Sequence, residues 1–100
     1  MFAVLYRWRL RPGSEEQFRD GWERVTRAIG TSCGSFGSRL HRAADGTWVA
    51  YARWPDAPTR ERCVFDEPEG ERLMSESVVE RFPELTLELV SDLLVEPVAS

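Results

Sequence analysis

His41 and Arg39 are the residues of this sequence whose types and spacing best suit proton transfer. His41 is the only histidine in the 100 residues, and histidine is the side chain that ordinarily titrates near neutral pH. Residues two positions apart in a strand point to one face, so a regular strand would place Arg39 beside His41. The pair predicts a general base acting on a phenol or an acidic C–H, with a guanidinium stabilising the anion. The alternative is an exposed or hydrogen-bonded histidine without a catalytic role.

Aromatic side chains form the second group of candidates. Eleven residues are aromatic, and four of these are tryptophans. Trp54 ends a predicted strand directly before Pro55, where it would stack a flat substrate or supply an electron-rich neighbour for oxygen chemistry; the alternative is a core aromatic. Further predicted substrate contacts are Tyr6, Trp8, Trp22 and Phe36, of which the first two share a strand face and the third is better explained as helix core.

Several other chemistries lack their residues. Cys33 and Cys63 have no metal-ligand spacing, and no glycine-rich phosphate loop precedes a helix, so we expect neither a metal nor a cofactor. The two cysteines could form a disulfide, but no signal peptide is evident, which favours a cytoplasmic protein with reduced thiols. All thirteen basic residues are arginine, which excludes Schiff-base chemistry on lysine. The net charge of −4 argues against nucleic acid or an anionic membrane as a partner.

The elements that must position these side chains follow from hydrophobic periodicity. Residues 2–11 alternate as in a strand, which Pro12-Gly13 ends. Ser14 fits a helix N-cap with Gln17 completing a capping box. A helix should then run to Gly30, its apolar stripe formed by Phe18, Trp22, Val25 and Ile29.

The second half of the chain repeats this alternation of strands and helices. We expect a strand over 36–42, a tight turn at Asp45-Gly46 and a strand over 47–54. A short helix over 59–64, a helix over 71–81 and a last long strand over 85–93 should follow. The order is β-α-β-β-α-β, a ferredoxin-like α+β fold with a four-stranded antiparallel sheet. One domain would cover residues 1–96, with a tail at 97–100.

Such a sheet has two faces, and its two helices can cover only one of them. The predicted strands carry large side chains on both faces, with Trp48 and Trp54 on one side of their strand and Val49 and Tyr51 on the other. A monomer would leave an aromatic-rich face in water, so we expect a homodimer in which two sheets pack together.

The segment Gly34-Ser35-Phe36-Gly37-Ser38-Arg39-Leu40 resembles the Gly-Ser-x-Gly-Ser-x-Leu signature of the antibiotic-biosynthesis-monooxygenase family. Arg11-Pro12-Gly13 with the first helix, and Tyr51-Ala-Arg-Trp54-Pro, are also similar to that family, so the resemblance covers about residues 2–95. It implies a dimeric α/β barrel with a pocket between the sheet and the helices of each subunit.

The resemblance implies a cofactor-independent monooxygenase that oxidises a phenol, a quinol or an anthrone-like small aromatic ligand. Two departures matter. The heme-degrading branch uses an Asn, a Trp and an axial His on a late helix, but this chain has no Asn and its one histidine is on a strand, so only Trp54 matches. The missing Asn also separates it from the cofactor-free oxygenases. The alternatives are therefore a non-catalytic small-molecule-binding or interaction dimer and, less favoured, an isomerase or cyclase.

Overall fold

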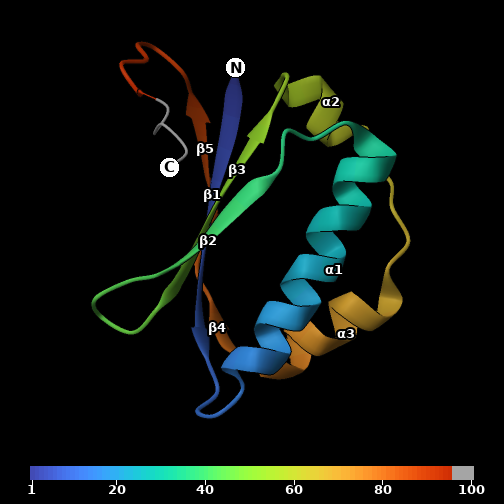
Figure 1. The fold of residues 1–100 in the computed structure, drawn as a ribbon, viewed down its shortest axis with the longest axis vertical. Coiled ribbons are helices and arrows are strands. Elements are labelled where there is room, and N and C mark those ends of the chain that lie inside the picture. The colour runs from blue at the N-terminus through green and yellow to red at the C-terminus, as the bar shows by residue number, and fades with distance from the viewer. Residues whose placement is uncertain (96–100) are drawn as a thin grey trace, which may run out of the picture.

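One antiparallel sheet with helices on one side of it makes up the computed structural model, which describes residues 1–95 (Figure 1). The predicted tail at 97–100 therefore lies outside the described residues. The elements in chain order are β1 (Phe2–Leu10), α1 (Glu15–Cys33), β2 (Ser38–Arg42), β3 (Trp48–Trp54), α2 (Ala57–Glu61), α3 (Pro68–Ser77), β4 (Val78–Arg81) and β5 (Leu85–Glu88). The predicted α+β class is confirmed, although the sheet has five strands rather than four.

Strand β1 is the centre of this sheet. The strand order is β2-β3-β1-β4, and β5 also pairs with β1. On one side β1 is antiparallel to β3 along its length, from Phe2 opposite Trp54 to Trp8 opposite Trp48. On its other side β5 pairs with the first half of β1 and β4 with the second half. The chain's first strand thus aligns all the strands that carry the candidate aromatic residues.

The end of the chain differs from the prediction. The helix expected over 71–81 ends at Ser77, and the following Val78-Val79 pair begins β4. The beta-branched residues Val78 and Val79 favour a strand, and the second half of β1 has a free edge with which this strand can pair. The expected strand over 85–93 is also shorter, because pairing stops at Glu88.

Helix α1 also differs at both ends. The hydroxyl of Ser14 makes no capping bond within the helix and instead donates to the backbone oxygen of Arg11. The side chain of Gln17 donates to the Leu73 oxygen of α3, so the predicted capping box is wrong. The helix passes Gly30 and ends at Cys33, because Gly34 (φ 71°) supplies the left-handed C-cap. The expected strand at 36–42 accordingly begins at Ser38, and the short helix expected at 59–64 begins earlier, at Ala57.

The core lies between the sheet and the two longer helices. Phe18 of α1 is fully buried and packs edge-on against Trp8 and Trp48 of the sheet. Helices α1 and α3 cross at Gly21 and Gly70, where a Cβ on Gly21 would lie 2.7 Å from the Gly70 oxygen. The two helices are therefore held at a fixed close approach that no larger residue permits.

Cys33 and Cys63 form a disulfide in the structure, with Cα atoms 5.2 Å apart. The prediction of reduced thiols is therefore wrong for this structure. The bond joins the last residue of α1 to the connection between α2 and α3, and only the folding of that connection back over α1 brings the cysteines together. The cytoplasmic location that accompanied the expectation stays a prediction.

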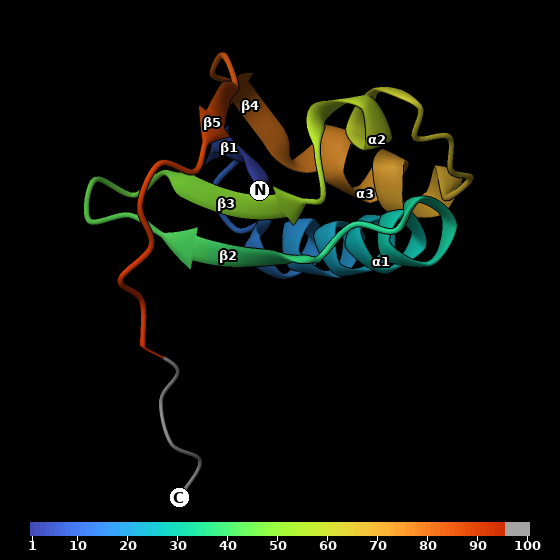
Figure 2. The ribbon, with the colours of Figure 1, turned by 90° about the horizontal axis from the view of Figure 1, so that it is seen from above.

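No helix of residues 1–95 lies on the opposite face of the sheet (Figure 2). The segment after β5 lies on this side, and its apolar residues are exposed, Val90, Leu93, Leu94 and Val95 each by more than four fifths. No helix within residues 1–95 is long and apolar enough to cross a membrane.

Candidate ligand-binding pocket

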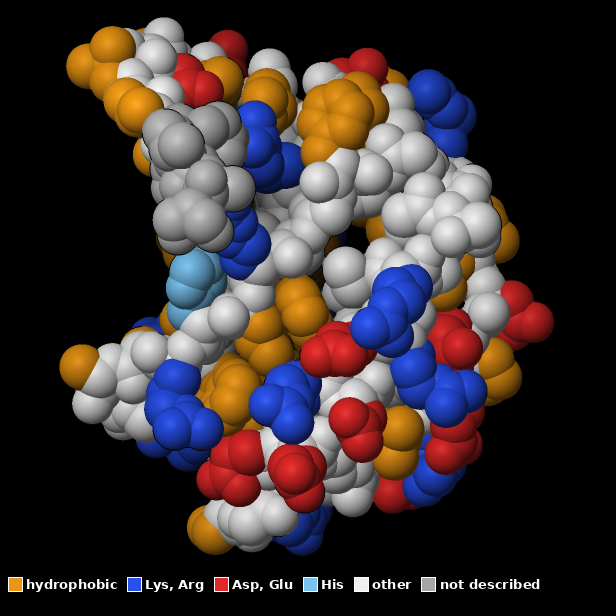
Figure 3. Space-filling view, viewed as in Figure 1, with side chains coloured by type: hydrophobic (Ala, Val, Ile, Leu, Met, Phe, Trp, Pro, Cys, Tyr) orange, Lys and Arg blue, Asp and Glu red, His pale blue; other side chains and the backbone are white. Residues whose placement is uncertain are grey.

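A pocket of about 520 Å³ lies between the helix-covered face of the sheet and helices α1 and α3. The space-filling view shows the corresponding hollow between the two layers (Figure 3). Its walls come from β1, β2, β3, α1, α3, β4 and the connections between them, and they are mostly apolar and aromatic. A concave, largely apolar cavity with a few polar groups is the usual form of a small-molecule site.

The strand register explains why there is room at this place. Tyr6 and Trp8 point to the same face of β1, and their rings stack with centroids 5.8 Å apart. Beside them on β3 the side chains are small, because Ala50 is opposite Tyr6 and Ala52 is opposite Val4. The large rings on β1 therefore lie next to the methyl groups of the β3 alanines. Helices α1 and α3 cover the space above these alanines but do not fill it.

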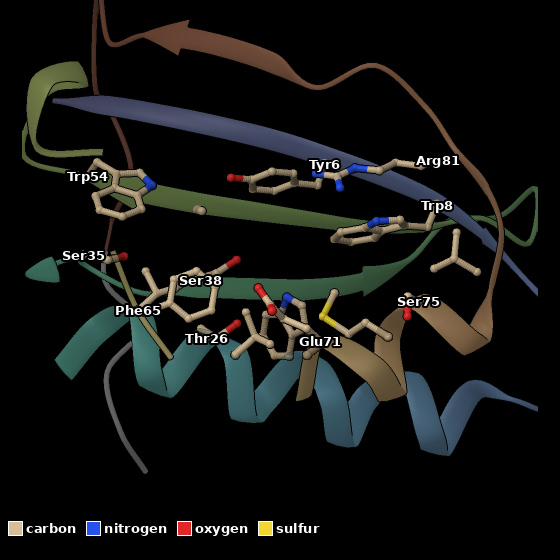
Figure 4. A pocket seen from close by; sticks show the side chains of 16 residues that line it. Tyr6, Trp8, Thr26, Ser35, Ser38, Trp54, Phe65, Glu71, Ser75 and Arg81 are labelled. Carbon is tan, nitrogen blue, oxygen red and sulfur yellow. The ribbon is translucent and has the colours of Figure 1, made fainter. Parts of the chain in front are cut away.

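Trp54 closes one end of the pocket. Its side chain is 4% exposed, yet its indole Nε1 has no hydrogen-bond partner among the described residues. In the close-up this nitrogen lies on the side of the ring that faces the other pocket residues (Figure 4). A buried donor without an acceptor costs about 1–3 kcal/mol. An acceptor oxygen on a ligand at this end of the pocket would remove that cost.

The hydroxyl of Tyr6 is held by a charged network at the pocket wall. Arg60 donates from Nη2 to this hydroxyl at 3.1 Å and to the Glu84 carboxylate at 2.8 Å. Burial opposes the charge of Arg60, but the hydrogen bonds with Glu84 and Tyr6 outweigh it and raise the pKa of the guanidinium. Since the Tyr6 oxygen accepts from Arg60, its own O–H remains available to donate to a ligand.

Glu71 is the one carboxylate among the lining residues of the described chain. It projects from α3 toward the space below Tyr6 and is an exposed residue, so it lies at the open rim of the pocket (Figure 4). Within residues 1–95, its carboxylate takes part in none of the salt bridges of the structure. Glu71 lies on one face of α3 with Met74 and Ser75, which also line the pocket, as does Val78 at the start of β4.

Four of the predicted site residues meet in this pocket, namely Tyr6, Trp8, Trp22 and Trp54. The other three do not. Phe36 is 60% exposed outside it. Arg39 and His41 are in register with Tyr51 and Val49, on the sheet face turned away from the helices. They share a face with each other, as the spacing predicts, but they do not contact a ligand in this pocket, and their catalytic role stays a prediction.

Glu71 is the site residue that the sequence reasoning missed. Its spacing from Met74 and Ser75 is i, i+3 and i+4, which is the signature of one helix face. That signal was available, but a carboxylate at the edge of an apolar stripe usually marks the solvent boundary. In the part of the chain that the structure describes, no group of three or more His, Cys, Asp or Glu residues could hold a metal ion.

No protein-family model and no curated protein matches the sequence. Solved structures do match. A protein from Bordetella bronchiseptica, named for the antibiotic biosynthesis monooxygenases, superposes with a TM-score of 0.76 at 18% identity, over 90% of this chain and 97% of that one. SnoaB from Streptomyces nogalater, a cofactor-independent oxygenase, superposes with a TM-score of 0.75 at 14% identity, over 92% and 95% of the two chains.

A protein from Nitrosomonas europaea, also named for the antibiotic biosynthesis monooxygenases, gives a TM-score of 0.73 at 10% identity and is covered over its full length. At these identities the likeness concerns the fold. The resemblance seen in the sequence is thus confirmed at that level: this chain has the fold of the antibiotic biosynthesis monooxygenase structures over nine tenths of its length.

Proposed function

We propose that the protein binds a flat phenolic, quinol or anthrone-like compound in this pocket and oxygenates it with molecular oxygen, without a cofactor. The observation that carries the proposal is the unpaired, buried N–H of Trp54 in an otherwise aromatic cavity. This N–H can donate to an acceptor oxygen of a ligand. The rings of Tyr6 and Trp8 suit stacking against a planar ligand. The shared fold with a cofactor-independent oxygenase adds support.

The chemistry requires the substrate to lose a proton and then electrons. For an anthrone, removing a C–H proton leaves the electron pair on the ring system as an enolate. Transfer of one electron to oxygen gives a radical and superoxide, which join through a new C–O bond. The resulting peroxide is protonated; the remaining hydrogen on the same carbon then leaves as a proton while the C=O forms and the O–O bond breaks, and the released hydroxide takes up that proton. Anthrone and O₂ thereby become the quinone and water. The N–H of Trp54 and the O–H of Tyr6 would stabilise the enolate oxygen.

Replacing Trp54 with Phe tests this proposal, because the ring wall is kept and the donor is lost. We expect oxygen uptake with anthrone to fall roughly 100-fold, as it does when one oxyanion donor is removed elsewhere. An oxygen electrode measures the rate directly.

The matched control is Trp48→Phe, on the same face of β3 but packed on Phe18 in the core and outside the pocket. It should retain most of the rate. Equal rates in Trp54→Phe and wild type would contradict the role given to the indole N–H.

A second candidate is a binding protein without catalysis. It is favoured by the position of His41, the predicted base, on the face away from the pocket. In that case anthrone would quench the fluorescence of the pocket tryptophans while no oxygen is consumed. Titration of fluorescence alongside oxygen uptake separates the two functions.

We also propose that the protein is a homodimer joined through the uncovered sheet face. Leu5 and Tyr51 are a cross-strand pair on that face, and the partly exposed Leu85 is next to Leu5 on β5. Leu5, Tyr51 and Leu85 thus form an apolar patch across three strands, bordered by Arg39 opposite Tyr51, and an uncovered apolar patch on a small domain is typical of a protein interface. A two-fold axis would bury the same patch on both copies.

A further inference from the structure

The proposed reaction needs a proton acceptor inside the pocket, and the strand histidine is not there. Of the ionisable side chains among the described lining residues, Arg81 is permanently charged and has no proton-accepting role. The hydroxyl of Tyr6 already accepts a hydrogen bond from Arg60. The carboxylate of Glu71 is the remaining candidate.

The backbone that carries Glu71 is held firmly. Its neighbour Gly70 lies where α3 closely approaches α1. A Cβ added to Gly70 would lie 3.0 Å from a Val25 methyl group and 3.1 Å from the Gly21 oxygen. The Gly70 N–H donates to the Glu67 side chain at 2.8 Å, and Gln17 of α1 fastens the next turn through the Leu73 oxygen. A base must be positioned within hydrogen-bond reach of the proton it removes, and this anchoring provides a fixed origin for the side chain.

The carboxylate of Glu71 also differs from the other acidic groups of its helix. Glu69 and Glu76 both bind Arg72, and the cap residue Glu67 binds Arg24. A carboxylate engaged by an arginine is a poor proton acceptor, because the ion pair favours its charged form. Glu71 has no such ion pair with any residue in 1–95, and it is the member of the set that faces the pocket.

We propose that Glu71 is the general base of this site, an inference that rests on the proposed oxygenation. A carboxylate oxygen of Glu71 takes the acidic C–H or O–H proton of the substrate, and the bonding electron pair stays on the substrate as an enolate or phenolate. Molecular oxygen is the oxidant of that anion, as described above. The ligand class follows from the two ends of the site: a planar compound with an acceptor oxygen toward Trp54 and an acidic hydrogen toward α3.

The test compares wild type with Glu71→Gln, which keeps the shape and loses the proton acceptor. Anthrone is the probe, because its anion absorbs visible light that the neutral form does not. In the absence of oxygen, wild type should generate the anion on binding and Glu71→Gln should bind without generating it. In air, oxygen uptake by Glu71→Gln should be about 100- to 10,000-fold slower, the usual contribution of a general base.

Two further variants separate a base from a structural residue. Glu71→Ala should regain part of its rate when formate is added, because a small carboxylate can occupy the vacated space and accept the proton. Glu76→Gln, on the same helix but outside the pocket, is the matched control and should keep the wild-type rate.

The outcomes distinguish this inference from the function it rests on. If wild type consumes oxygen and the rate of Glu71→Gln is within threefold of the wild-type rate, Glu71 is not the base, but the proposed oxygenation is unaffected. Wild type that binds anthrone but neither forms its anion nor consumes oxygen would overturn both.

Discussion

The carboxylate of Asp45 ties the β2–β3 hairpin together at the residue scale. One oxygen accepts from the N–H of Thr47 at 2.9 Å and from its hydroxyl at 2.6 Å, and the other accepts from Arg7 at 2.8 Å. The Thr47 hydroxyl, then its N–H and, more weakly, Arg7, lower the pKa of Asp45 from 3.8 to about 2. Arg7 also donates from Nε to the hydroxyl of the buried Thr47 at 3.2 Å, so these contacts link the turn to β1.

A lowered pKa makes this contribution to stability dependent on pH. Unfolded Asp45 takes up its proton near pH 3.8 and folded Asp45 only near pH 2, so the stabilisation is complete above the higher value and is lost as the pH falls toward the lower one. Asp45→Asn should melt at a lower temperature than wild type at neutral pH, with the gap closing between about pH 4 and pH 2. Thermal denaturation followed by circular dichroism measures this gap; one that stays constant down to pH 2 would contradict the assignment.

Side-chain types at this scale were largely predictable, and their surroundings were not. The aromatic rings of the sequence predict four residues of the pocket, and the structure places all four around one cavity: Tyr6, Trp8, Trp22 and Trp54. The face that His41 occupies depends on which side of the sheet the helices cover. Strand alternation states only that His41 and Arg39 share a face.

The connection between α2 and α3 is the element whose position depends most on one bond. Phe65 of this connection forms part of the pocket wall, and the neighbouring Cys63 is tied to the end of α1 by the disulfide. The elements on either side were foreseen approximately, from Pro and Gly at their ends. The disulfide from this connection to the end of α1 was possible from the sequence but was not expected, because no signal peptide is evident and a cytoplasmic protein keeps its thiols reduced.

Breaking this disulfide should destabilise the protein and loosen the pocket wall. A crosslink of this kind usually contributes 2–4 kcal/mol, roughly, by restricting the unfolded chain. The double variant Cys33→Ser/Cys63→Ser should therefore unfold at a lower urea concentration than wild type and bind anthrone more weakly.

A dithiol reductant provides the control for that experiment. It should shift the urea midpoint of wild type toward that of the double variant and leave the variant itself unchanged. A wild-type midpoint that is the same with and without reductant would show that the bond contributes nothing to stability.

Within residues 1–95, helices cover one face of the sheet, and the other, the bare face, has no helix and only the segment after β5 beside it. The helix-covered face holds the pocket, and the bare face holds the predicted dimer contact, so binding and association are assigned to opposite sides of the same strands. Leu85 and Leu87 extend the bare face at its edge and are 56% and 36% exposed. Their exposure makes them suitable for substitution without disturbing the core.

Placing charge on this edge tests the dimer. Leu85→Glu/Leu87→Glu should convert a dimer to a monomer in sedimentation velocity at micromolar concentration, because burying two carboxylates on each side is costly. Val64→Glu, at a residue that is 83% exposed in the α2–α3 connection, is the matched control and should stay dimeric. Wild type that sediments as a monomer would contradict the proposed interface.

The sequence alone predicts much of this protein. The alternation in β1 and β3 and the apolar stripe of α1 follow from residue spacing within each element, and the composition already shows an aromatic content suited to a pocket. Packing was required for the rest. The register of β1 against β3 sets alanines beside the large rings, the Gly21–Gly70 crossing brings Glu71 over them, and the folded connection joins two distant cysteines. The physical reason is that periodicity defines which residues share a face within one element, whereas a cavity is made between elements, where the spacing along the chain carries no information.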